Sequence, residues 1–316
     1  MTVAVGGRRG VDLSNGLENI PVLIERSPDE PTCPEFQYSP DNVQGPGCTV
    51  DPSEITVPGC SCITQSCFTE SCSCLQAHGR AYNNTRILLD LHKTNTGYCS
   101  PVFECNALCS CGDTCSNRVV QRGLRLRLEV FSTWNRGWGV RTLEPIKCGK
   151  FVCEYAGEVI GFEEARRRQL AQMTGQNNYI IAVREHAGTD SVTETFVDPA
   201  VVGNVGRFLN HSCLPNLFML PVRVHSVVPR LALFAGRDID VLEELTFDYS
   251  GGYSNQPSVE LLSTRSDAAI QASRTDGLQR KACHCGSVPL GLQSHSCHLV
   301  LEHGYLGFFL WALLCT

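Results

Sequence analysis

The sequence predicts a mainly β domain, preceded by a segment that is held together by bound metal rather than by an apolar core. Short apolar runs separated by turn residues follow one another between residues 126 and 250, which is typical of a domain of many short strands. Before them, ten of the nineteen cysteines fall between Cys60 and Cys115. Of the 316 residues, 42% are apolar and 18% are charged, so the chain can bury a core and is neither disordered nor fibrous.

Residues 1–59 are expected to form an extended N-terminal segment. Eight of the sixteen prolines lie between Pro21 and Pro58, and proline interrupts helices. The opening residues contain no continuous apolar stretch, so they lack the pattern of a secretory signal. We therefore expect an intracellular chain with reduced thiols, in which clustered cysteines indicate metal binding rather than disulfides.

The cysteine spacing predicts a zinc cluster in residues 60–118. Two runs, C-x-C-x4-C-x4-C-x-C and C-x3-C-x-C-x3-C, together supply nine thiols. Zinc takes four ligands and readily accepts thiolate, so nine sulfurs fill the twelve positions around three zinc ions when three sulfurs bridge. A cluster of this kind is closed and structural. The expected ligands are Cys60, Cys62, Cys67, Cys72, Cys74, Cys105, Cys109, Cys111 and Cys115.

Two alternatives for these thiols stay open at this point. Independent zinc fingers would use some of them together with a histidine such as His78. A disulfide framework would require an exported chain. Cys99 lies outside both runs and is expected to be a free thiol.

The region from 126 to 250 is expected to hold the strands and one helix. The helix is predicted over residues 162–173, which are rich in Glu, Arg, Ala and Gln. Residues 251–316 begin as a polar linker and end in an apolar tail. The longest apolar run, residues 305–315, is shorter than the ~20 residues of a membrane-spanning helix, so no membrane segment is expected. The strands are predicted at residues 126–131, 138–143, 151–160, 179–183, 196–198, 230–236 and 244–249.

Three further motifs contain residues suited to binding a ligand or to catalysis. Residues 136–140 read RGWGV, and glycines on both sides of Trp138 let a ligand approach the backbone closely, although glycine near a strand more often marks a turn or bulge. Residues 207–213 read RFLNHSC and combine an amide, an imidazole and a thiol. Residues 244–249 read ELTFDY and end a strand on a tyrosine.

In this order, and after a nine-cysteine cluster, these motifs resemble the SET-domain protein-lysine methyltransferases of the suppressor-of-variegation class. The resemblance implies a pre-SET zinc cluster over residues 60–118. It implies a SET domain over residues 126–250, built from several short sheets with a knot-like C-terminal threading. It also implies a nuclear, chromosomal enzyme that transfers methyl groups from S-adenosylmethionine to a lysine of a histone H3 tail or nucleosome.

The resemblance assigns roles to individual residues. Tyr155 and Tyr249 would line the channel for the target lysine, and Phe247 would leave room for di- or trimethyllysine. Lysine has a pKa of about 10.4, and an apolar channel beside the donor's sulfonium would lower it without a strong base. Taken alone, each tyrosine would fit a half-buried core position. The residues expected to hold the cofactor are Arg136, Gly137, Trp138, Tyr179, Arg207, Asn210 and His211.

The match to this class is incomplete near the C-terminus. The family's post-SET segment binds a further zinc ion through three cysteines and the cysteine of the NHSC motif. Cys213, Cys283 and Cys285 are present here, but Leu290 stands at the last expected position. Three thiols do not close a structural site, so a fourth zinc ion is doubtful unless a residue of the tail replaces the missing ligand. The candidates for this replacement are His295, Cys297 and His298.

The incomplete post-SET segment leaves a second function open, a SET-fold chromatin-binding module with impaired catalysis. A zinc-cluster nucleic-acid binder is a third hypothesis. It is disfavoured because the net charge is -6 and because no strong basic stripe is present. We therefore do not expect direct DNA binding. The arginines that could contribute to such a stripe, which are more typical of solvated faces, are Arg122, Arg125, Arg127 and Arg166 to Arg168.

Overall fold

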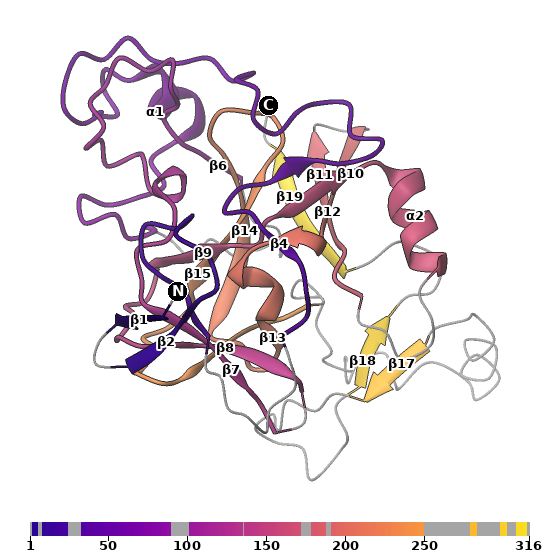
Figure 1. Ribbon diagram of the computed structural model, residues 1–316. Coiled ribbons are helices and arrows are strands. Elements are labelled where there is room, and N and C mark those ends of the chain that lie inside the picture. Colours follow the sequence, from indigo (N-terminus) through magenta and orange to yellow (C-terminus); the bar gives the residue numbers. More distant parts are fainter. Residues whose placement is uncertain are drawn as a thin grey trace, which may run out of the picture.

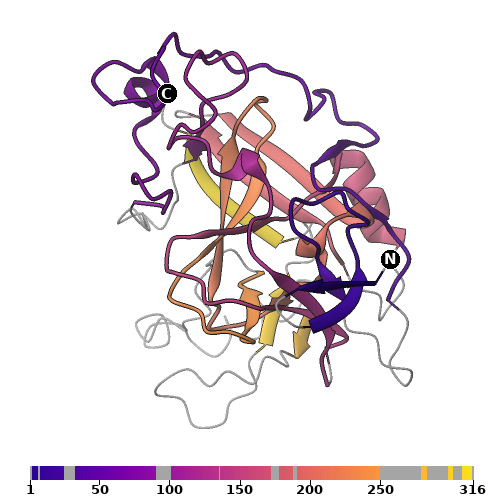
Figure 2. The same ribbon diagram turned by 60° about the vertical axis from the view of Figure 1, so that its left-hand side comes forward.

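The chain folds into a cysteine-rich lobe and a pair of sheets, seen in a computed structural model (Figure 1). The structure describes residues 2–5, 8–24, 33–89, 101–134, 136–171, 178–187, 191–249, 279–282, 298–301 and 308–314. The described part is mainly β, which confirms the predicted fold class. Helix α1 (Ser73–His78) belongs to the cysteine-rich lobe, and helix α2 (Phe162–Ala171) lies on the other side of the sheets, as both views show (Figure 2).

The larger sheet contains two predicted strands that carry motifs: β8, with part of RGWGV, and β16, with part of ELTFDY. β16 lies between β8 and β14, and the short β13 lies parallel to β16. This arrangement brings residues 210–211 and 244–247 side by side, although more than thirty residues separate them in sequence. The strands, in spatial order, are β1 (Thr2–Val5), β2 (Arg8–Asp12), β3 (Leu23–Ile24), β7 (Leu128–Ser132), β8 (Trp138–Thr142), β16 (Glu244–Phe247), β14 (Leu217–Arg223), β15 (Arg230–Ala235) and β9 (Phe151–Glu154), with β13 (Asn210–His211) beside β16 and β6 (Val102–Phe103) beside β14.

The second sheet joins the N-terminal segment to the strands that follow α2. Two short strands of the N-terminal segment, β4 and β5, pair in parallel with β12 and β10. β17 (Gln279–Ala282) and β18 (His298–Leu301) form a separate pair. The strands of the second sheet are β19 (Phe308–Leu314), β11 (Ile181–Ala187), β12 (Ser191–Gly203), β10 (Gly157–Ile160), β5 (Val43–Gln44) and β4 (Gln37–Tyr38).

The main apolar core lies where the two sheets meet. Its buried residues come from β7, β8, β9, β11, β14, β15 and β16, together with the turn η2 (Val205–Phe208). A smaller core lies between β14, β15 and the 3-10 turn η1 (Val120–Arg122), and connects the cysteine-rich lobe to the larger sheet. Tyr82 is fully buried in this smaller core, where it packs against Phe234.

The structure corrects three details of the sequence prediction. Residues 151–160 form two strands, β9 and β10, which break at Tyr155. β14 was not predicted. Pro221 lies in its interior, and a proline, which lacks the backbone N–H donor, argues against a strand in a sequence pattern. Arg168 is not on a solvated face: it bridges α2 to the second sheet through Glu158 at 2.7 Å and Asp198 at 2.9 Å.

Of the two described helices, α2 was predicted and α1 was not. α2 begins at Phe162, as predicted, and residues 172–173 of the predicted helix lie outside the described residues. In the part of the chain that the structure describes, neither helix has the length and apolar character needed to cross a bilayer.

Candidate active site and metal centre

Eight of the nine predicted zinc ligands form three overlapping groups of four. In each group the sulfur atoms all lie within 4.8 Å of one another. Cys60 and Cys67 each belong to two groups, and Cys105 belongs to all three. Three groups that share sulfurs are the arrangement that bridging thiolates require. The groups are Cys60, Cys67, Cys72 and Cys105; Cys60, Cys74, Cys105 and Cys109; and Cys67, Cys105, Cys111 and Cys115.

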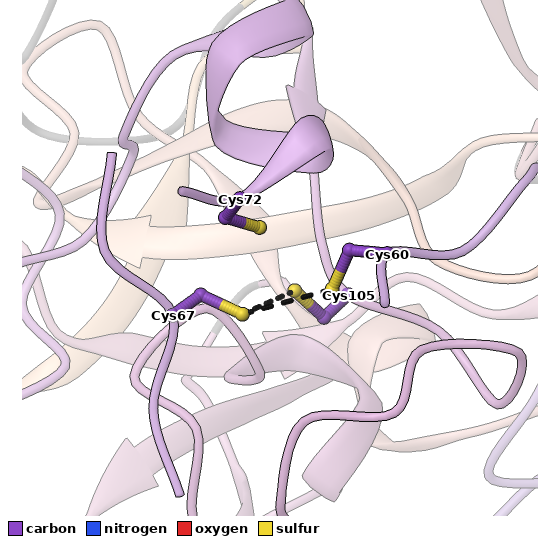
Figure 3. A group of neighbouring side chains, drawn as sticks. All are labelled: Cys60, Cys67, Cys72 and Cys105. Carbon is purple, nitrogen blue, oxygen red and sulfur yellow. Dashed lines mark hydrogen bonds between the residues drawn. The ribbon is translucent and has the colours of Figure 1, made fainter. Parts of the chain in front are cut away.

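The sulfur spacing fits zinc. Four sulfurs bound tetrahedrally at about 2.3 Å from zinc lie about 3.8 Å apart. The Sγ atoms of Cys60 and Cys67 are 3.7 Å apart, as are those of Cys67 and Cys105 (Figure 3). The Cys74–Cys109 separation is 3.8 Å. These distances are far above the ~2.05 Å of a disulfide bond, so the geometry favours metal over disulfides.

The cluster is surrounded by groups that stabilise thiolates. The backbone N–H groups of Cys60 and Asn106 donate to Cys109 Sγ at 3.3 and 3.2 Å. Arg118, which is only 7% exposed, donates from Nη2 to Cys111 Sγ at 3.4 Å. A hydrogen bond from the Cys105 thiol lowers the pKa of Cys109 to about 4. Three Zn²⁺ ions with nine thiolates carry three net negative charges, so a buried guanidinium here compensates part of that charge.

Two residues of the lobe lie outside these groups. Cys62 Sγ contacts the Ser71 carbonyl at 3.7 Å and packs against the buried thiols, but it belongs to none of the three groups. The ring of His78 stacks on Phe103 at 3.7 Å, and His78 joins no metal-binding group among the described residues. The independent-finger alternative therefore gains no support from His78. Cys99 lies outside the described residues.

Three aromatic residues that sequence analysis placed in the lysine channel come together. Phe247 lies between the other two, 6.1 Å from the Tyr155 ring and 4.8 Å from the Tyr249 ring, measured between centroids. They come from the β9–β10 break and from the end of β16. Tyr155 and Phe247 are both 4% exposed. This cluster forms an apolar wall that carries two phenol oxygens.

The hydroxyls of both tyrosines donate hydrogen bonds to backbone carbonyls. Tyr155 Oη donates to the Tyr179 carbonyl at 2.6 Å, and Tyr249 Oη donates to the Leu209 carbonyl at 2.6 Å. Burial raises the pKa of both phenols, so they stay protonated at neutral pH. A hydroxyl that donates its hydrogen bond to a carbonyl keeps lone pairs, which can accept a hydrogen bond from another donor. Each of the two phenol oxygens can therefore accept a hydrogen bond from an N–H group of a neutral amine.

The predicted cofactor residues Arg136 and Asn210 meet at a carboxylate that sequence analysis missed. Asn210 Nδ2 donates to Glu244 Oε1 at 2.9 Å and to the Trp138 carbonyl at 3.1 Å. Arg136 Nη2 donates to Glu244 Oε2 at 2.6 Å. The only sequence signal for Glu244 was a charged residue opening an otherwise apolar strand, a signal with little specificity.

The backbone beside Arg136 is open at Gly137 and closely packed at Gly139. Gly137 has φ +67°, and a Cβ built there would meet nothing within 4 Å. At Gly139 a Cβ would lie 2.9 Å from Thr133 and 3.0 Å from Glu244 Oε1. Glycine is needed at 137 for its left-handed conformation and at 139 for close packing. The space beside Gly137 is thus open to a ligand that contacts the backbone, and the cofactor contact at Gly137 stays a prediction.

His211 and Cys213 lie at the edge of this site. Nδ1 of His211 accepts from the Tyr249 backbone N–H at 3.2 Å, and Nε2 lies 3.3 Å from Cys213 Sγ. Burial lowers the pKa of His211. Cys283 and Cys285, the other predicted ligands of the fourth zinc ion, lie outside the described residues. So do His295 and Cys297, whereas for His298 only the backbone is described. The fourth zinc site stays a prediction.

Arg207 and Tyr179, two further residues predicted to hold the cofactor, contact each other. The Arg207 guanidinium carbon lies 5.0 Å from the centroid of the Tyr179 ring. Arg207 is 7% exposed and donates from Nε to the Pro199 carbonyl at 3.0 Å. The structure thus brings the two residues together through their side chains, and their roles as cofactor contacts stay predictions.

Two family models match this chain. A Pre-SET motif matches residues 14–118, and a SET domain matches residues 137–250. Histone-lysine N-methyltransferase SETMAR of Mus musculus is 51% identical over 276 residues, which cover 87% of this chain and 86% of the mouse protein. This chain belongs to the SET-domain histone-lysine methyltransferases.

Other members of the SET-domain family show the same likeness. Human SETMAR is 53% identical over 211 residues, and the match covers 66% of this chain and 29% of the human protein. The crystal structure of the human SETMAR methyltransferase domain superposes with a TM-score of 0.73 at 46% identity, covering 95% of this chain and 98% of that domain. Arabidopsis thaliana SUVH6 in complex with SAM gives a TM-score of 0.67 at 30% identity, covering 89% and 54% of the two chains.

A structure with a bound peptide is also similar. KRYPTONITE in complex with mCHH DNA, an H3(1-15) peptide and SAH has a TM-score of 0.64 at 31% identity, covering 88% of this chain and 52% of KRYPTONITE. The predicted SET fold and pre-SET cysteine cluster are confirmed by these likenesses. The predicted domain limits at residues 60, 118, 126 and 250 stay predictions.

Proposed function

We propose that this protein transfers methyl groups from S-adenosylmethionine to a lysine of a histone H3 tail, and that it forms di- or trimethyllysine. The observation that carries the proposal concerns the hydroxyls of Tyr155 and Tyr249. Both lie beside Phe247, and each donates a hydrogen bond to a backbone carbonyl. Relatives that bind SAM, SAH and an H3 peptide support the cofactor and the substrate. A nuclear, chromosomal location follows from that substrate.

The aromatic wall suits a neutral lysine amine. A lysine side chain has a pKa of about 10.4 in water, and only the neutral amine has the lone pair needed for attack. Tyr155 and Phe247 are nearly fully buried, so an amine beside them loses water and its ammonium form is disfavoured. The two phenol oxygens accept the N–H groups of the neutral amine, which aims its lone pair away from them. Orientation of this kind supplies a large share of rate acceleration.

Residues around Gly137 fit the methyl donor. S-Adenosylmethionine, when bound, supplies the electrophilic methyl group on its sulfonium sulfur. The open space beside Gly137 admits a ligand against the backbone. Residues 136–138, together with Asn210 and His211, would contact its amino acid and adenine parts. The ion pair between Arg136 and Glu244 holds one side of this cradle.

The cysteine groups would hold three zinc ions as a structural support. Zinc, when bound, supplies cross-links among thiolates from segments that are far apart in sequence. Its ligands would be the nine thiols of residues 60–115, with Cys60, Cys67 and Cys105 in the shared positions. Because a closed thiolate cluster leaves no open coordination position, it takes no part in the reaction.

Transfer of a labelled methyl group to core histones tests this function. The protein is expected to label histone H3 when given S-adenosyl-[methyl-³H]methionine. Tyr249→Phe removes one phenol oxygen and is expected to lower labelling by about 10²-fold or more. Tyr82→Phe, which removes a buried hydroxyl that donates to Glu104 in the smaller core, is the matched control and keeps activity. Binding of the methyl donor without any labelling would instead favour the chromatin-binding module.

A further inference from the structure

A residue of the N-terminal segment packs against the wall of the active site. Phe36 lies just before β4, and its ring faces the Arg207 guanidinium, whose carbon is 4.3 Å from the ring centroid. The same guanidinium lies 5.0 Å from the centroids of Tyr179 and Phe208. Three aromatic rings from three separate segments thus surround one buried cation.

The rings compensate for a poorly satisfied guanidinium. Arg207 is 7% exposed, and its Nη1 atom has no hydrogen-bond partner among the described residues. Its other nitrogens donate to the carbonyls of Pro199 and Ala200. A buried cation that lacks hydrogen bonds is costly, and desolvated aromatic faces are among the few groups that stabilise it. Removal of one ring therefore weakens the force that holds the guanidinium in place.

Phe36 is fixed in the second sheet on its C-terminal side. Gln37 and Tyr38 pair with residues 202–203 at the end of β12, and Ser39 N–H donates to the Gly203 carbonyl at 2.8 Å. The Phe36 ring also packs edge-on against Phe208, with centroids 5.7 Å apart and planes at 70°. The N-terminal segment is thereby held at the turn that leads into the RFLNHSC motif.

The contacts continue from the cation to a tyrosine of the lysine channel. Tyr179 stacks on Arg207 with its ring, and its carbonyl accepts the hydrogen bond from Tyr155 Oη at 2.6 Å. Tyr179 precedes β11, which begins at Ile181, so it lies outside the strand pairing of the sheet. The stacking of its ring on Arg207 is therefore one of the contacts that place it.

We propose that Phe36 is a positioning residue for Tyr155, and that it acts through Arg207 and Tyr179. The N-terminal segment, which precedes the cysteine cluster, would then be part of the catalytic apparatus. The proposal rests on the proposed function, because Tyr155 matters only if a lysine is bound in the channel.

Kinetics of four proteins test the proposal. Phe36→Leu keeps most of the apolar volume and removes the aromatic face, so kcat on an H3 peptide is expected to fall about tenfold, while the zinc content stays unchanged. Phe36→Tyr restores the ring and is expected to restore kcat. Phe162→Leu is the matched control, because Phe162 packs edge-on against Phe196 and its ring contacts no cation among the described residues. Equal kcat values for Phe36→Leu and Phe162→Leu would overturn the proposal.

A second measurement does not depend on turnover. With tyrosines labelled at ¹³Cζ, the Tyr155 signal is assigned by its loss in Tyr155→Phe. The signal is expected to shift in Phe36→Leu and in Arg207→Lys, which keeps the charge but lacks a planar group to stack, and to stay in place in Phe162→Leu. An unmoved Tyr155 signal in Phe36→Leu would refute the positioning role even in a protein that labels no histone. If the shift occurs without any methyl transfer, it is the proposed function that fails.

Discussion

Glu244 accepts hydrogen bonds from Asn210 at 2.9 Å and from Arg136 at 2.6 Å, so one carboxylate fixes both residues. The three side chains come from β16, from β13 and from the turn before β8, which the sheet places side by side. Asn210 and Arg136 were both predicted to hold the cofactor. Glu244 therefore acts behind them. It takes one of the two Nδ2 hydrogens of Asn210, while the Trp138 carbonyl takes the other, and it sets the direction in which the remaining donors of Arg136 point.

Substitutions of Glu244 are expected to weaken binding of the methyl donor. Glu244→Ala removes both hydrogen bonds and is expected to lower the affinity for S-adenosylhomocysteine about tenfold, because hydrogen bonds to charged groups are worth about 1.5–3 kcal/mol. Glu244→Gln keeps an acceptor for Asn210 and is expected to lose less. Isothermal titration calorimetry measures both. The control is Glu243→Gln at the neighbouring carboxylate, which pairs with Arg237 instead; unchanged affinity in Glu244→Ala would contradict this role.

Phe247→Tyr is expected to stop the reaction at an earlier methylation state. Phe247 lies between the two channel tyrosines, and an added hydroxyl would fill space that a second or third methyl group needs. Mass spectrometry of an H3 peptide after full reaction is expected to show di- or trimethyllysine for the native protein and mainly monomethyllysine for the variant. A native product confined to monomethyllysine, and unchanged by the substitution, would disprove this account of the product.

Loss of Cys105 is expected to disrupt the whole zinc cluster. Cys105 belongs to all three sulfur groups and is fully buried, so Cys105→Ser removes a ligand from each. Elemental analysis is expected to find about three zinc ions per native chain and far fewer in the variant. Folding energy of about 10 kcal/mol per structural zinc ion means that the cysteine-rich lobe should also unfold on chelation. Cys148→Ser, a half-buried thiol outside the groups, should retain full zinc content.

Glu154 is expected to make the fold less stable as the pH rises toward neutrality. Burial raises the pKa of Glu154 to about 7, and its Oε1 atom has no hydrogen-bond partner among the described residues. The folded chain therefore holds a proton that the unfolded chain has already released above about pH 4.3. Stability falls wherever the folded state binds more protons, by up to about 4 kcal/mol across this interval.

Urea unfolding between pH 4.5 and pH 7.5 tests the role of Glu154. Glu154→Gln cannot ionise, so its stability relative to the native protein is expected to increase as the pH rises. Glu163→Gln, at an exposed carboxylate in the first turn of α2, is the control substitution. A constant difference between Glu154→Gln and the native protein would show that Glu154 is ionised in the fold.

Local patterns predicted the metal centre and, wholly or in part, the strands β7 to β12, β15 and β16. Cysteine spacing reports ligands directly, because a metal site needs particular residue types at short separations, and the three sulfur groups meet that expectation. Strand patterns located β7, β8, β15 and β16 within two residues at each end. The break at Tyr155 was not visible, because residues 151–160 are apolar enough to read as one strand.

Contacts between distant segments could not be predicted from those patterns. Glu244 meets Asn210 and Arg136 only because β16 lies beside β13 and β8. Phe36 reaches Arg207 across more than 150 residues of sequence, in a segment that composition describes merely as proline-rich. Pairing of distant strands is a property of the whole sheet, and a single sequence carries no local signal for it.

A crystal structure with S-adenosylhomocysteine and an H3-tail peptide tests the central claim most directly. The target lysine is expected to enter between Tyr155 and Tyr249, with Nζ within about 3.2 Å of at least one phenol oxygen and both hydroxyls still donating to the carbonyls of residues 179 and 209. A lysine bound elsewhere, or hydroxyls turned away from those carbonyls to donate to Nζ, would contradict the account.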